Sequence, residues 1–111
     1  MILKNYNFIN HLPEGDYSGV IQACTPSSCG RYLWFKIAID NSLEVLNVSV
    51  PIVSQVLNDF AKSYTDSEGN FDTDDFITSK VDFSLKDKII NGEAYSKIIY
   101  IERMEDEANE A

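Results

Sequence analysis

The feature that most constrains the fold is a strict alternation of residue types between Arg31 and Asp40, in the segment RYLWFKIAID. Large apolar side chains occupy every second position: Leu33, Phe35, Ile37 and Ile39. This period of two is typical of a β-strand that buries one face in a hydrophobic core. The pattern therefore predicts a strand whose opposite face, with Tyr32, Trp34 and Lys36, points outward.

Four more strands are predicted, over residues 16–24, 43–50, 80–86 and 94–102. In the first of them, Gly19 indicates a bulge or a sharp bend. Pro51 ends the strand over 43–50, because proline has no N–H to donate to a neighbouring strand. Asn91-Gly92, between the last two strands, is a strong signal for a hairpin turn.

Between the third and fourth strands the apolar residues change to a spacing of three and four, from Val53 to Tyr64. This spacing predicts one helix with an apolar stripe. Asp72 or Thr73 is placed to cap a short helical turn ahead of Phe76. Residues 103–111 have no apolar stripe, so we expect them to be a mobile acidic tail.

Five strands with one helix between the third and the fourth is the element order of the oligonucleotide/oligosaccharide-binding fold, the OB-fold. We therefore expect a mainly β protein: a closed five-stranded barrel, plugged at one end by the helix. Residues 1–102 would form this single domain, and an unrelated α+β sandwich is the alternative.

Charge is distributed unevenly along the chain. The 111 residues include 18 acidic and 9 basic ones, which gives a net charge of −9 at pH 7. Residues 59–75 contain six acidic residues and one basic residue, and residues 102–111 contain five acidic residues and one basic residue. The rest is close to neutral. No apolar run approaches the roughly 18 residues of a membrane span, and no signal peptide is apparent, so a cytoplasmic location is expected.

Catalytic and metal-binding patterns are missing from the sequence. Cys24, Cys29 and His11 are too few for a structural zinc site, and free thiols are expected in a reducing compartment. In the acidic loop over residues 66–75, every second residue from Asp66 to Asp74 carries a side-chain oxygen that could bind calcium. The EF-hand pattern nevertheless fails, because Phe71 and Ile77 stand where it needs glycine and glutamate. We expect neither enzymatic activity nor a cofactor.

Several stretches of the chain resemble small single-stranded-DNA-binding proteins of phages and mobile elements. They cover most of residues 12–102 and read LPEGDYSGVI, GRYLWFKIAI, VSVPIVSQVLNDF, SKVDFSLKD and NGEAYSKIIYIE. The resemblance implies an OB-fold. It also implies an acidic carboxy-terminal tail that recruits partners in replication or recombination.

The outward face of the strand over 31–40 is the predicted binding surface for single-stranded nucleic acid. Exposed Trp and Tyr side chains are platforms on which bases stack, and nearby cations contact phosphates. The predicted site residues are Arg31, Tyr32, Trp34, Lys36, Lys86, Lys88, Tyr95 and Lys97. Two alternatives stay open: Trp34 is covered by the amino-terminal segment or by a second copy, and the lysines belong to an ordinary mixed-charge surface. Whether Tyr95, Ile98 or Tyr100 points outward is also undecided.

The acidity of the chain supports a rival function, in which carboxylates imitate DNA phosphates and bind a basic host protein. The residues for that function are Glu68, Asp72, Asp74, Asp75, Glu105, Asp106 and Glu107. Oligomeric state is open as well, because the apolar residues at the amino terminus either cover a second copy or fold back on their own domain: Met1, Ile2, Leu3, Phe8 and Ile9.

Overall fold

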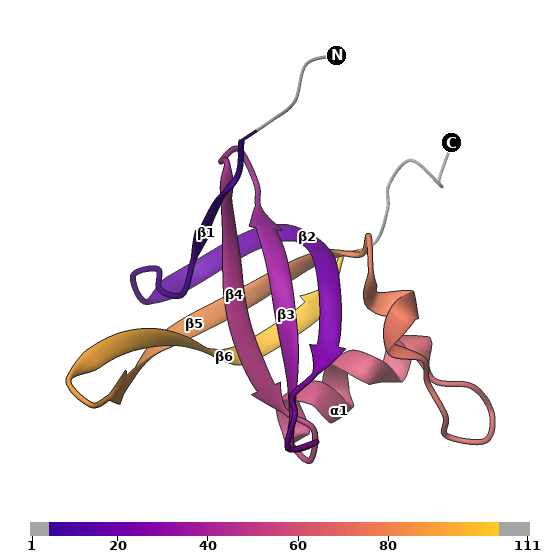
Figure 1. Ribbon diagram of the computed structural model, residues 1–111. Coiled ribbons are helices and arrows are strands. Elements are labelled where there is room, and N and C mark those ends of the chain that lie inside the picture. Colours follow the sequence, from indigo (N-terminus) through magenta and orange to yellow (C-terminus); the bar gives the residue numbers. More distant parts are fainter. Residues whose placement is uncertain (1–4, 105–111) are drawn as a thin grey trace.

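Six strands form one open sheet in the computed structural model, which describes residues 5–104. The strands are β1 (Asn7–Ile9), β2 (Gly15–Pro26), β3 (Tyr32–Ile39), β4 (Glu44–Pro51), β5 (Lys80–Ile90) and β6 (Glu93–Arg103). Their order across the sheet is β1-β4-β3-β2-β5-β6. Neighbours are antiparallel except β1 and β4, which are parallel. The sheet is strongly curled, so that β3 and β4 cross over β5 and β6 (Figure 1).

The mainly β architecture is confirmed, but the expectation of a closed five-stranded barrel was wrong. The additional strand, β1, has only three residues, too few for a period of two to be recognised. It pairs with the free edge of β4, where its register joins Phe8 to Val45. No ladder joins β4 to β6 within the part of the chain that the structure describes.

The gap between β4 and β6 is bridged at both ends by other segments. At one end, helix α1 (Gln55–Ala61) packs against both strands (Figure 1). At the other end, the chain that follows β1 is hydrogen-bonded to β6, since the Ser96 N–H donates to the Asn10 carbonyl (3.0 Å). Residues 7–10 are thus hydrogen-bonded to the edges of their own sheet.

The helix is shorter than the predicted span of Val53 to Tyr64. Ser54 has extended backbone and caps α1, because its hydroxyl accepts a hydrogen bond from the Leu57 N–H (3.2 Å). Val53 therefore lies outside the helix. After Ala61 the chain tightens into the 3₁₀ turn η1 (Lys62–Tyr64). The predicted short helical turn is confirmed as η2 (Thr73–Phe76), with Asp72 as its cap.

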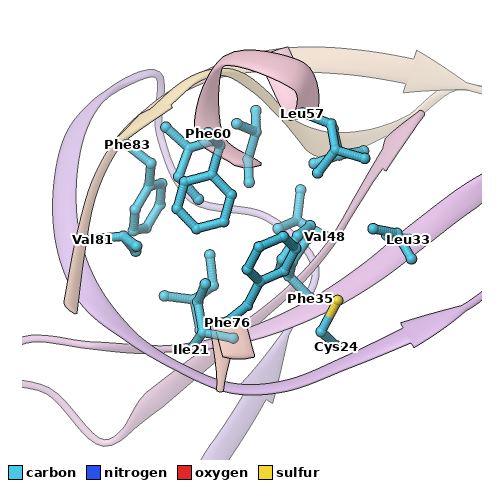
Figure 2. Close-up of a cluster of buried hydrophobic side chains, with 14 of the residues drawn as sticks. Ile21, Cys24, Leu33, Phe35, Val48, Leu57, Phe60, Phe76, Val81 and Phe83 are labelled. Atoms are coloured by element: carbon cyan, nitrogen blue, oxygen red, sulfur yellow. The ribbon is translucent and has the colours of Figure 1, made fainter. Parts of the chain in front are cut away.

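The core lies between the curled sheet and the helical segments. Phe35 from β3, Phe60 from α1 and Phe76 from η2 meet there, with ring centroids 4.9 Å apart for Phe60 and Phe76 and 6.1 Å for Phe35 and Phe76 (Figure 2). The predicted alternation of β3 and β5 is confirmed: Leu33, Phe35 and Ile37 are buried on β3, as are Val81, Phe83 and Leu85 on β5.

Two bulges interrupt the ladders, and neither is at the glycine where one was expected. In β2 the register slips at Gln22. Gly19 instead lies where β3 and β5 both pair with β2, and a Cβ there would be 2.4 Å from the Ala38 carbonyl oxygen. In β6 the register shifts at Ile99, which has no partner on β5. Because of this extra residue, Ile98 and Ile101 both point into the core although they are three positions apart.

The end of the domain lies slightly beyond the predicted boundary at residue 102. Arg103 still belongs to β6, and the Met104 N–H donates to the Lys80 carbonyl (2.8 Å). The rest of the predicted tail, 105–111, lies outside the described residues, as do Met1, Ile2 and Leu3. None of the helices within 5–104 has the length and apolar character needed to span a membrane.

Candidate nucleic-acid interface

The outward face of β3 carries the residues that its alternation predicted. Tyr32, Trp34 and Lys36 are all exposed, and 41% of the Trp34 surface is accessible. Their neighbours on β4 are Pro51, Ser49 and Asn47, each directly opposite its β3 partner. Within residues 5–104, the amino-terminal segment therefore leaves the indole exposed.

Trp34 forms one wall of a groove with a volume of about 260 Å³. Asn47, Val48 and Ser49 of β4 belong to the same wall, and the facing wall is the β5–β6 hairpin, with Lys88, Ile90, Tyr95 and Ser96; Asn10 completes the lining. Three of the predicted residues, Trp34, Lys88 and Tyr95, are thus brought together although they are far apart in the sequence.

The amino-terminal segment determines where the hairpin lies. Asp87 and Ser96 are opposite each other on β5 and β6. The Ser96 hydroxyl accepts from the Leu12 N–H (2.8 Å) and donates to the Leu12 carbonyl (3.2 Å). His11 contacts the Asp87 carboxylate at 2.8 Å, and the Asp87 N–H donates to Glu14 at 2.9 Å. These bonds hold one face of the hairpin, and Lys88 and Tyr95, which line the groove with Trp34, are at outward positions of the other face.

The hairpin face toward the groove is basic. Lys86 is directly opposite Lys97, and the next pair of outward positions joins Lys88 to Tyr95. Like charges opposite each other on a sheet repel, so the Lys86–Lys97 pair costs stability unless an anion screens it. Among the described residues, no carboxylate lies within 4.0 Å of Lys36, Lys86, Lys88 or Lys97.

The position of the Tyr95 ring is set by its neighbour on the same strand. The Tyr95 hydroxyl donates to the Glu93 carboxylate at 2.9 Å. This hydrogen bond, with the charge of Glu93, raises the pKa of Tyr95 above its ordinary value. Ile98 is buried and Tyr100 points outward on a separate surface, which settles the question left by the sequence.

Sequence reasoning missed several residues of this surface. Phe8 on β1 is 61% exposed, and the Lys36 ammonium lies 5.3 Å from the centre of its ring. Asn10, Asn47 and Ser49 line the groove itself. Alternation on β4 placed Asn47 and Ser49 on one face, but nothing local marked that face as the side toward the hairpin.

Other predicted residues are not part of the groove. Tyr32 is the first residue of β3 and Arg31 precedes the strand, so both lie beyond Trp34 and outside the groove. In the acidic loop, Glu68, Asp74 and Asp75 are exposed, whereas the Asp72 carboxylate accepts from the Asp74 N–H (2.9 Å) and so holds the loop backbone. Glu105, Asp106 and Glu107 lie outside the described residues.

An acidic surface that the sequence did not reveal lies on the outward face of β2, β5 and β6. Register places Ser18, Asp82 and Glu102 in one row and Asp16, Ser84 and Tyr100 in the next. Ser18 donates to Asp82, and Ser84 donates to Asp16. Within residues 5–104, no three His, Cys, Asp or Glu side chains are grouped so that they could hold a metal ion.

Fold and groove together define a mainly β protein with an open six-stranded sheet and a groove that is lined by two aromatic rings and one lysine. Comparison with protein-family models, with curated proteins and with solved structures gives no match.

Proposed function

We propose that this protein binds single-stranded nucleic acid without catalysing a reaction, and that the groove around Trp34 is its binding site. The observation that carries the proposal is the meeting of two aromatic rings, Trp34 and Tyr95, with the Lys88 ammonium in one groove. Bases stack on such rings with about 1 to 3 kcal/mol each, and lysines contact the phosphates.

The arrangement of the sheet supports this site. We regard the fold as an opened variant of the OB-fold, in which the amino-terminal segment replaces the ladder that would close the barrel. Oligonucleotides bind OB-folds on the second and third strands and beside the loop between the fourth and fifth. The corresponding elements here are β3, β4 and the β5–β6 hairpin, which are the two walls of the groove.

The resemblance of several stretches to single-stranded-DNA-binding proteins of phages and mobile elements favours DNA as the ligand. It further favours a role in replication or recombination. Stacking tolerates any base, and phosphate contacts are independent of sequence, so the lysines and rings account for a general affinity for single strands.

The test is a titration of a fluorescently labelled single-stranded oligonucleotide, followed by anisotropy at low and at moderate salt. We expect salt-sensitive binding, which Trp34→Ala weakens about tenfold or more because one base loses its platform. Tyr100→Ala is the matched control, since it removes an exposed aromatic ring outside the groove. The intrinsic fluorescence of the wild-type protein should also change on binding, because Trp34 is its only tryptophan.

Two results would overturn the proposal. One is the absence of binding at low salt, which would favour the rival function as an acidic imitation of DNA. The other is an equal loss of affinity for Trp34→Ala and Tyr100→Ala, because the groove would then have no special part in binding.

A further inference from the structure

Strand β1 places a further aromatic ring beside the proposed binding site. This strand pairs with the outer edge of β4, where the Asn7 N–H donates to the Leu43 carbonyl (2.8 Å). Ile9 of β1 packs against the core, so the preceding residue, Phe8, points to the outward side of the sheet. Phe8 is 61% exposed, more than any other aromatic side chain among residues 5–104. Its ring is therefore open to a ligand.

Lys36 connects this ring to Trp34. Along β3 it is the next outward residue after Trp34, and its ammonium lies 5.3 Å from the centre of the Phe8 ring. The register continues in the same direction, because Phe8 is aligned with Val45 on β4 and Val45 with Ala38 on β3. Within residues 5–104, no carboxylate lies within 4.0 Å of Lys36. The outer surface thus presents a ring, a cation and a second ring in order.

We infer that Phe8 is a base-stacking platform in addition to Trp34, and that Lys36 binds a phosphate between the two stacked bases. The inference rests on the proposed function. A single strand alternates bases with phosphates, and this surface alternates rings with a cation in the same way. The lysine stem is flexible, so its ammonium can exchange the Phe8 ring for a phosphate. The bound strand then runs from the groove across β4 to β1.

The first test is an anisotropy titration of a labelled oligomer of about twelve thymidines, a length within the range of site sizes for OB-folds. We expect Phe8→Leu to weaken binding about fivefold or more, because leucine keeps an apolar side chain but removes the platform of one base. Phe8→Tyr, which keeps a ring, should stay within about twofold of the wild type. Phe71→Leu is the matched control and should bind like the wild type, since Phe71 is an exposed phenylalanine in the loop between η1 and η2.

The phosphate contact has its own readout, which is the salt dependence of the same titration. Lys36→Gln should reduce the slope of log affinity against log salt by about 0.7 in magnitude, the contribution of one phosphate on a single strand. An unchanged slope would overturn the assignment of that contact to Lys36.

The second test uses the wild-type protein and does not depend on how a variant folds. An oligomer that carries one 5-iodouracil base is irradiated in the complex, and the cross-linked peptides are identified by mass spectrometry. We expect cross-links to both Trp34 and Phe8. Cross-links to Trp34 without Phe8, or equal affinities for Phe8→Leu and Phe71→Leu, would overturn the inference and leave the proposed function standing. Failure of the wild-type protein to bind the oligomer would overturn both.

Discussion

Cys24 and Cys29 are five positions apart in the sequence but lie in opposite environments. Cys24 is buried in the core, and Cys29 is exposed in the turn before β3. Burial, with the nearby charge of Asp74, raises the pKa of Cys24 to about 11. A hydrogen bond with Ser27 (3.3 Å between the oxygen and sulfur atoms) is the main cause that lowers the pKa of Cys29 below its ordinary value. Because the thiolate is the reactive form, the two thiols should react very differently.

We predict that an excess of a thiol reagent at pH 8 modifies one cysteine per folded chain quickly and the second only after denaturation. Mass spectrometry of the peptides should place the fast label on Cys29. Cys29→Ser should abolish the fast phase, whereas Cys24→Ser should leave it unchanged. Rapid modification of Cys24 in the folded protein would contradict the burial of that side chain.

At the scale of elements, the amino-terminal segment and the β5–β6 hairpin depend on each other. The Ser96 hydroxyl is buried and serves both backbone groups of Leu12. Removing it leaves two buried polar groups without a partner, and an unsatisfied group of this kind costs about 1 to 3 kcal/mol.

We therefore predict that Ser96→Ala lowers the free energy of unfolding by about 1 to 3 kcal/mol, measured by urea denaturation. Hydrogen exchange of the Leu12 amide should become faster in this variant. Ser28→Ala, in an exposed turn, is the control and should change stability by less than about 0.5 kcal/mol. Equal stabilities for the two variants would mean that water replaces the lost hydroxyl.

Across the whole molecule, charges of opposite sign are collected in different stretches of the surface. The net charge is −9, yet Lys86 and Lys97 share one face of the hairpin. The carboxylates of Asp16, Asp82 and Glu102 lie on the same outward face of the sheet, further from the hairpin turn. A chain repelled by nucleic acid overall can therefore attract it locally, because screening limits the repulsion from distant charges.

We predict that the double variant Lys86→Gln/Lys97→Gln reduces the slope of log affinity against log salt by about 1.4 in magnitude. Each phosphate contact on a single strand contributes about 0.7 to that slope. Lys62→Gln is the matched control, because Lys62 lies on η1 and is paired with Asp59 at 3.4 Å. The prediction is wrong if the double variant and the control have the same slope.

The local patterns of the sequence were enough to predict most elements of the fold. Strand β3 and its outward residues followed from alternation, η2 from its Asp72 cap, and the hairpin turn from Asn91-Gly92, whose backbone adopts the positive φ that the turn requires. Such features depend on residues that are neighbours in the chain, so they can be predicted from a single sequence. Strand β1 was missed because three residues are too few to show a period.

The sequence alone was sufficient to predict which side chains point outward on β3 and β5, since without a bulge the pleat makes that a matter of counting. Which outward faces meet could be seen only in the folded molecule. The curl of the sheet, the bulge at Ile99 and the tether from Leu12 to Ser96 bring Trp34, Lys88 and Tyr95 into one groove. These contacts join residues about 50 to 80 positions apart, and no local pattern records how far a sheet curls or where its register slips.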